Sequence, residues 1–213
     1  KGWVDSLGAS RHGELAAFCD VDELGKKRRG GFVEAAKKWP KAKRYTDWRE
    51  MLEKEKLDGV TVSTPDHRHA PVTMTALKLG ISPYTQKPLT RTVHEARALT
   101  LAAREAKVAT QMGNQNHSGV NYKGLVDLVR AGLLGKIERA YAWSNRPIWP
   151  QGHQRPNGSS KIPNGLHWDL WLGLAFHNIT IVNNPPIQYL LVRHPIQDRK
   201  QLRLELVRTL RLI

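Results

Sequence analysis

The sequence predicts an α/β protein built on a doubly wound parallel sheet. Two short apolar runs, 15–19 and 59–64, each end at a polar residue, which is typical of buried strands. Amphipathic helical spacing separates the two runs, and the alternation of helix and strand continues after Pro65. Because parallel neighbours are joined by right-handed crossovers, this alternation favours one parallel sheet with helices on both faces.

The other elements are expected in order along the chain. Between the two strands, helical spacing with charges on one side predicts helices over 22–39 and 47–56. After Pro65 the pattern predicts a helix over 70–79, a strand over 81–85, a helix over 93–106 and a strand over 108–112.

The sequence divides into three segments of different character. Residues 1–136 carry the helix and strand alternation and are expected to form the first domain. An alternating strand pattern over 137–143 opens a second, incomplete α/β domain over 137–173. Residues 174–213 contain none of the 17 glycines and none of the seven tryptophans. Turns and helix C-caps normally need glycine, so this tail is interpreted as out-of-frame or unstructured sequence, with a small helical appendage as the alternative.

The composition excludes several classes of protein. A single cysteine, Cys19, leaves no intrachain disulfide and no multi-cysteine zinc site. No run approaches the roughly 18 apolar residues of a membrane span, so no membrane partner is expected. The net charge of +15 raises nucleic acid as a partner, yet the basic clusters at 26–29 and 37–44 lie among acidic and apolar positions. No recognition motif accompanies them, and a solvated face is the better interpretation.

Polar residues follow each expected strand of the first domain. Ligands of doubly wound sheets bind at the carboxyl ends of the strands, so these residues define a candidate site. The segments at these strand ends are Asp20, then Ser63, Thr64 and Pro65, then Gln86, Lys87 and Pro88, and then Gly113, Asn114 and Gln115.

Asp20 and Gly2 have the spacing of a dinucleotide site. An acid at a strand end, about 20 residues beyond a glycine fingerprint, binds ribose hydroxyls in such sites. Gly2 lies 18 residues before Asp20 and is therefore a candidate for the last glycine of that fingerprint. This interpretation places the first strand and the earlier glycines upstream of Lys1. The alternative is that Asp20 is an ordinary acid at the end of a strand.

Two further groups at this edge have competing interpretations. Asp66, His67 and His69 open a helix, where capping is a better explanation than a metal site, because histidines two apart seldom reach one ion. No metal is expected. Lys87 is followed by Pro88, which fixes the turn, and a lysine held there can hydrogen-bond a developing alkoxide. The alternative for Lys87 is an ordinary solvated lysine.

Taken together, these motifs resemble the Gfo/Idh/MocA family (glucose-fructose oxidoreductase, inositol dehydrogenase and MocA). The resemblance rests on five stretches in the family's order: 19–22, 63–69, 86–89, 110–115 and 145–150. It implies an N-terminal Rossmann domain that binds NAD(P), a C-terminal α/β domain that often mediates oligomers, and sugars or cyclitols as substrates. The resemblance ends at about Gly173.

The resemblance also assigns roles to residues. Lys87 matches the catalytic lysine of a Glu-Lys-Pro motif, although Gln86 stands here in place of the glutamate. The residues expected at the cofactor are Gly2, Asp20, Ser63, Thr64, Pro65, His69, Gln86, Lys87, Pro88, Asn114 and Gln115. Those expected on the substrate side are Arg146, Trp149, Trp168 and Asp169.

The expected function is hydride transfer between a nicotinamide cofactor and a sugar-type or cyclitol-type alcohol, impaired in this chain. NAD is expected rather than NADP, because a carboxylate such as Asp20 repels a 2′-phosphate. Two alternatives stay open: an NAD-dependent glycosidase of the same family, and a basic, non-catalytic nucleic-acid binder. The resemblance implies a homo-oligomer for the intact family but not for this chain. Two compartments are compatible with the sequence: the cytoplasm, or the periplasm if an export signal lies upstream.

Overall fold

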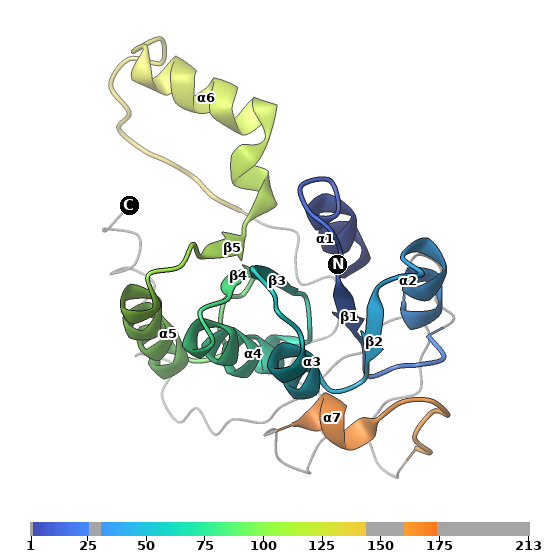
Figure 1. The fold of residues 1–213 in the computed structure, drawn as a ribbon. Helices are drawn as coiled ribbons and strands as arrows, with labels where there is room; N and C mark the ends of the chain where they lie inside the picture. Colours follow the sequence, from blue (N-terminus) through green and yellow to red (C-terminus); the bar gives the residue numbers. More distant parts are fainter. Residues whose placement is uncertain (1, 26–30, 144–159, 174–213) are drawn as a thin grey trace. The chain divides into compact units, whose positions relative to one another are not determined.

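A computed structural model describes residues 2–25, 31–143 and 160–173 (Figure 1). Helices and strands alternate over most of this length. In chain order they are α1 (Gly2–Ala9), β1 (Ala17–Cys19), α2 (Phe32–Lys38), β2 (Lys43–Tyr45), α3 (Trp48–Lys54), β3 (Gly59–Val62), α4 (Asp66–Lys78), β4 (Ser82–Gln86), α5 (Val93–Ala106), β5 (Gln111–Gly113), the 3₁₀ turn η1 (Gln115–Ser118), α6 (Val120–Arg130) and α7 (Trp168–Leu172).

All pairings between these strands are parallel, as the sequence predicts. β1 pairs with β2 in register Ala17↔Lys43, while β4 pairs with β3 on one side and β5 on the other. Among the described residues the strands form two groups, β1-β2 and β3-β4-β5. A doubly wound sheet seats its first strand in the middle, between the second and the fourth. The break between β1 and β3 falls at that place.

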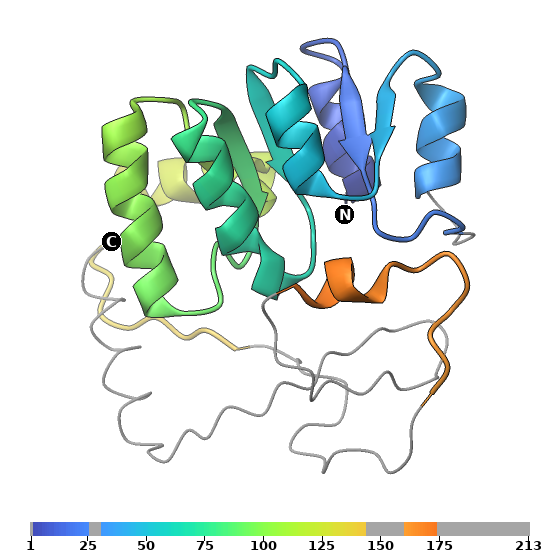
Figure 2. The same ribbon diagram turned by 60° about the horizontal axis from the view of Figure 1, so that its bottom comes forward.

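The helices lie on both faces of the strands (Figures 1 and 2). α3, α4 and α5 cover one face, and α1 lies on the other, against β3. The main core lies under α3 and α4, where Leu52, Val62, Val72 and Ala76 are 3%, 2%, 3% and 0% exposed. A second cluster between α4 and α5 centres on Leu99.

Local sequence signals explain where two of the helices begin. The Asp47 side chain accepts a hydrogen bond from the Arg49 backbone N–H at 2.9 Å and caps α3. Thr92 and Glu95 form a capping box at the start of α5. The predicted helix over 93–106 is confirmed with both of its ends, and the predicted strands at 15–19, 59–64, 81–85 and 108–112 are each present in shorter or shifted form.

Two expected elements are wrong in the described residues. The helix predicted over 22–39 is reduced to α2, because Asp22 instead forms an antiparallel bridge with Leu166 and Gly31 takes a φ of +126°. The strand predicted over 137–143 is not formed, and Tyr141 and Trp143 are 74% and 89% exposed. An alternating pattern makes a strand only when a neighbouring strand pairs with it, and no described residue does so.

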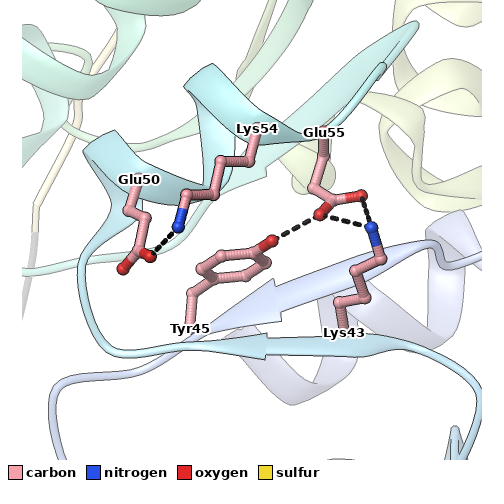
Figure 3. A network of polar contacts seen from close by, with 5 residues as sticks. All are labelled: Lys43, Tyr45, Glu50, Lys54 and Glu55. Atoms are coloured by element: carbon pink, nitrogen blue, oxygen red, sulfur yellow. Dashed lines mark hydrogen bonds and ion pairs between the residues drawn. The ribbon is translucent and has the colours of Figure 1, made fainter.

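Polar contacts fasten the edge strand β2 to the end of α3 (Figure 3). Lys43 Nζ donates to both oxygens of Glu55 at 2.9 and 3.0 Å, and the Tyr45 hydroxyl donates to the same carboxylate. This contact raises the pKa of Tyr45 to about 12, because the neutral phenol is the form that donates. Lys54 pairs with Glu50 beside it. Two basic side chains of this region, Lys43 and Lys54, therefore have acidic partners.

The described residues belong almost entirely to one compact unit. It joins the described residues up to 143 with 162–173, so the segment around α7 packs with the first domain. No described helix is long and apolar enough to cross a bilayer. The tail 174–213 and the basic cluster 26–29 lie outside the described residues.

Candidate functional site

Lys87 lies at the end of β4 between two neighbours that are fixed in place. Gln86 is 3% exposed, and its Nε2 donates to both carboxylate oxygens of Asp5 at 3.0 and 2.9 Å. The carbonyl of Pro88 is 2.6 Å from His69 Nδ1. Lys87 itself is exposed. The turn therefore holds the lysine backbone firmly while its ammonium is free to meet a ligand at the strand edge.

His69 is the buried support of this turn. Its ring is 1% exposed, and Nε2 lies 2.9 Å from the carbonyl of Thr64, which follows β3. Each ring nitrogen of His69 therefore faces a backbone carbonyl, which only accepts hydrogen bonds. The contacts join the turn after β3 to the turn after β4. Both ring nitrogens face the protein, and the expected role of His69 at the cofactor stays a prediction.

Asp5 connects α1 to the same edge. Besides Gln86, it accepts a hydrogen bond from Ser63 Oγ at 2.5 Å. The side chains of Ser63 and Gln86 thus share one carboxylate. Gly2, at the start of the helix, lies beside Ser63, where a Cβ on Gly2 would be 3.6 Å from the Ser63 Cβ, an ordinary van der Waals contact. The role expected of Gly2 as the last glycine of a fingerprint stays a prediction.

Three buried polar atoms at this edge have no hydrogen-bond partner among the described residues. They are Thr64 Oγ1, His67 Nδ1 and Gln86 Oε1. Buried polar groups in folded proteins are nearly always paired, and an orphan costs about 1–3 kcal/mol. Their gathering at the ends of β3 and β4 and the start of α4 fits an edge that is completed by a polar ligand.

Asp20 ends β1 as the sequence predicts. Its backbone N–H donates to the Tyr45 carbonyl at 3.2 Å, and its Oδ1 accepts the Asp22 N–H at 3.1 Å. Burial raises the pKa of the Asp20 carboxyl, and the backbone donors of Asp22 and Val21 oppose that rise. Burial also raises the pKa of the neighbouring Cys19 thiol to about 12, which excludes a thiolate nucleophile there.

Residues 165–171 cross the same edge of the domain (Figure 2). The His167 N–H donates to the Val21 carbonyl at 2.9 Å, and the Glu23 N–H donates to Gly165 at 3.0 Å. Further on, the Trp171 carbonyl lies 2.9 Å from His67 Nε2. This segment, named here the strap, runs from the loop after Asp20 to the first turn of α4.

The two predicted substrate-side residues of the strap open α7. Trp168 stacks on Trp171 with ring centroids 4.9 Å apart and planes 9° apart. Asp169 is exposed in the first turn. The other two, Arg146 and Trp149, lie outside the described residues. The roles of all four on the substrate side stay predictions.

The attachment of the strap at His67 is expected to depend on pH. Burial lowers the pKa of its ring, outweighing the contact with the Trp171 carbonyl, which raises it. Because the pKa of His67 is lower in the folded protein than the ordinary histidine value of about 6.5, the attachment is fully stable above pH 6.5. It loses stability as the pH falls below that value. We therefore expect amide exchange of 165–173, corrected for intrinsic rates, to accelerate between pH 7.5 and 5.5.

The variant His67→Phe serves as the control for that expectation. It keeps an aromatic ring against Trp171, whose centroid is 5.3 Å away, and removes the titrating group. Its exchange in 165–173 should be faster than in the unaltered protein at pH 7.5 and nearly independent of pH. An equal acceleration in both proteins would contradict a role for His67.

Asn114 and Gln115 follow β5 and are exposed. The Asn114 N–H donates to the Met112 carbonyl at 2.8 Å, and Gln115 Nε2 donates to the Tyr84 hydroxyl at 3.0 Å. Gln115 therefore lies beside β4, and the expected roles of Asn114 and Gln115 at the cofactor stay predictions. Within the described ranges, no three acidic, histidine or cysteine side chains are placed to hold a metal ion.

The parallel strands, the helix that starts at Gly2 and the polar strand ends define a Rossmann-type dinucleotide-binding domain. The family described as an oxidoreductase family with an NAD-binding Rossmann fold, Gfo/Idh/MocA, matches residues 6–114. The chain belongs to this family, as the sequence motifs indicate.

Individual relatives agree with this assignment. The chain is 28% identical over 198 residues to an alpha-N-acetylgalactosaminidase of Shewanella oneidensis, a match that covers 82% of this chain and 43% of the relative. It is 30% identical over 127 residues to the rhizopine catabolism protein MocA of Rhizobium meliloti, covering 59% and 40%. The chain thus spans less than half the length of these curated relatives.

Solved structures support the fold. A myo-inositol 2-dehydrogenase from Lactobacillus plantarum superimposes with a TM-score of 0.52 at 23% identity, covering 58% of this chain and 35% of that one. A probable dehydrogenase from Thermotoga maritima superimposes with a TM-score of 0.54 at 22% identity, covering 62% of this chain and 38% of that one. The WlbA dehydrogenase from Bordetella pertussis, solved with NADH and UDP-GlcNAcA, gives 0.53 at 20%, covering 62% and 39%.

Two contacts that shape the site, that of Asp5 with Gln86 and that of Trp171 with His67, were not expected from the sequence. Asp5 had no signal, because an acid in the first turn of a helix is ordinary. The attachment of Trp171 to His67 joins residues 104 positions apart, which no local pattern reveals.

The elements α1, β2 and α6 were not expected either. β2, with the sequence Lys-Arg-Tyr, has no apolar run, whereas the apolar residues of α6 do recur at helical spacing.

Proposed function

We propose that this chain is the dinucleotide-binding part of an NAD-dependent oxidoreductase that acts on a sugar-type or cyclitol-type alcohol. The observation that carries the proposal is the placement of Lys87, exposed between two anchored neighbours at the carboxyl edge of a family-typical sheet. Bound NAD would supply the hydride acceptor, its nicotinamide ring. The orphaned polar atoms at the ends of β3 and β4 fit such a polar ligand.

Each residue of the edge has a role in this proposal. The Asp20 carboxylate accepts hydrogen bonds from ribose hydroxyls at the end of β1. The start of α1 at Gly2 leaves backbone N–H groups open to an anion, because the first N–H groups of a helix lack partners within it. The Nζ of Lys87 donates a hydrogen bond to the reacting oxygen of the alcohol and stabilises negative charge that develops on it.

Calorimetric titration with NAD tests the cofactor, and absorbance at the NADH band tests turnover with a panel of sugars and cyclitols. Saturable NAD binding together with NADH release is the expected result. A protein that binds neither NAD nor NADH would overturn the proposal. Salt-dependent retention on DNA, without nucleotide binding, would favour the nucleic-acid alternative instead.

A second candidate is an NAD-dependent glycosidase. It is favoured by the match to the alpha-N-acetylgalactosaminidase, which extends over 82% of this chain. A glycosidase that oxidises and re-reduces its sugar needs the same cofactor edge, so the described residues suit both reactions. Cleavage of an aryl N-acetylgalactosaminide without net NADH would favour the glycosidase, whereas steady NADH release would favour the dehydrogenase.

Asp20 should determine the preference for NAD. Its carboxylate accepts from a 2′-hydroxyl and repels a 2′-phosphate, so Asp20→Ser is expected to weaken NAD binding about 10-fold or more and to narrow its advantage over NADP. Competition titrations with both cofactors measure this. Asp58→Ser, an exposed acid before β3 at the opposite edge, is the matched control and should bind as the unaltered protein does. Tighter binding of NADP by the unaltered protein would refute the role of Asp20.

A further inference from the structure

One carboxylate joins the first turn of α1 to the ends of two neighbouring strands, β3 and β4. Asp5 lies in the first turn of α1, Ser63 follows β3, and Gln86 ends β4. Ser63 Oγ donates to Asp5 Oδ2 at 2.5 Å, and Gln86 Nε2 donates to Oδ1 and Oδ2 at 3.0 and 2.9 Å. Both partners are donors, so a single acceptor group satisfies the two strand ends.

The contact with Asp5 fixes which way the Gln86 amide faces. A carboxylate only accepts hydrogen bonds, so the amide must present Nε2 to Asp5 and turn Oε1 away. The side chain is 3% exposed and has little room to rotate, because it packs directly on Gly113. A Cβ at that glycine would lie 2.8 Å from both Cδ and Nε2 of Gln86. The orientation of the amide is therefore set by charge and enforced by packing.

The backbone of Lys87 is held in place by its two anchored neighbours. The amide of Gln86 is held by Asp5 on one side of the lysine, and the Pro88 carbonyl is held by His69 on the other. If either anchor is lost, the backbone that carries the ammonium can shift, and a displacement of about 1 Å is enough to cost a large factor in rate.

We propose that Asp5 is a positioning residue for Lys87: from α1 it supplies the carboxylate that orients Gln86 and holds the end of β4 in the geometry that ligand binding needs. The effect of Asp5 on catalysis through Lys87 rests on the proposed function. The pairing of Asp5 with Gln86 is independent of any ligand and can be tested separately.

The pairing is tested by reversing the two groups. Gln86→Glu places a second carboxylate against Asp5, and one of the two then has a raised pKa because both cannot ionise side by side. Stability is retained at low pH and lost as the pH rises. We expect a melting temperature about 4–8 °C below that of the unaltered protein at pH 7.5 and a smaller deficit at pH 5.

The double variant Asp5→Asn with Gln86→Glu restores one amide and one carboxylate in the opposite order. It should recover at least half of the lost melting temperature at pH 7.5, and its deficit should depend little on pH. Asp58→Asn, a distant exposed acid, is the control and should melt normally. Gln86→Glu that melts like the unaltered protein at both pH values, or a double variant no better than Gln86→Glu, would overturn the proposal.

Titration with NAD and turnover measurements extend the test to the site. Gln86→Glu is expected to lower kcat at least 10-fold, and the reversed pair should regain most of that loss. Recovery of stability without recovery of kcat would refute the role of Asp5 in positioning Lys87. Failure of the unaltered protein to bind NAD would refute the proposed function alone, because the stability comparison needs no ligand.

Discussion

Replacing Lys87 with methionine is expected to slow hydride transfer about 10²–10⁴-fold while NAD affinity changes less than about 3-fold. The side chain is exposed at the strand edge, and both of its neighbours are anchored by other residues. Methionine keeps the length of the side chain and removes the ammonium, so the loss falls on the charge that develops on the substrate oxygen. Single-turnover NADH absorbance measures the chemical step, and calorimetry measures cofactor binding.

A surface lysine elsewhere provides the control for this expectation. Lys78, exposed in the last turn of α4, lies at the opposite edge of the sheet, so Lys78→Met should react at the normal rate. An unchanged rate constant for Lys87→Met would remove the lysine from the mechanism. A large loss of NAD affinity with an unchanged chemical step would instead make Lys87 a cofactor-binding residue.

The sequence predicts most of the parallel framework because strand and helix signals are local. Val93 to Ala106 has a capping box at its start and apolar residues at helical spacing, so its limits are predictable from neighbouring residues alone. The pattern at 137–143 is also local, yet it specifies only that one face would be buried. No described strand pairs with it, so the pattern does not become a strand.

The candidate site was predictable to the extent that it follows strand ends. Asp20 and Lys87 lie where the alternation of elements places them, at the edge where ligands of such sheets bind. The contacts that hold the site are different in kind. Asp5 reaches Gln86 across 81 positions, and His67 reaches Trp171 across 104. Such pairs depend on how the helices pack, which composition and periodicity do not encode.

Truncating Leu52 to alanine is expected to cost about 2–5 kcal/mol of the free energy of unfolding. Leu52 is 3% exposed on α3 and packs in the cluster that contains Val62, Val72 and Ala76. Removing its branched end loses the free energy gained by burying those atoms away from water. It also leaves a cavity that the neighbouring side chains fill only in part. The total free energy of unfolding of a small domain is about 5–15 kcal/mol, so this one substitution would remove a large share of it.

Urea unfolding followed by circular dichroism measures the effect of Leu52→Ala, with Leu101→Ala as the matched control. Leu101 lies on α5 and is 65% exposed, so the same truncation there removes little buried surface and should shift the midpoint only slightly. Because the sheet is divided between β1 and β3, the cluster around Leu52 is the main apolar contact between the two groups of strands, through α3 and α4. A cooperative transition that persists in Leu52→Ala with an unshifted midpoint would show that the two strand groups are held together by something other than this core.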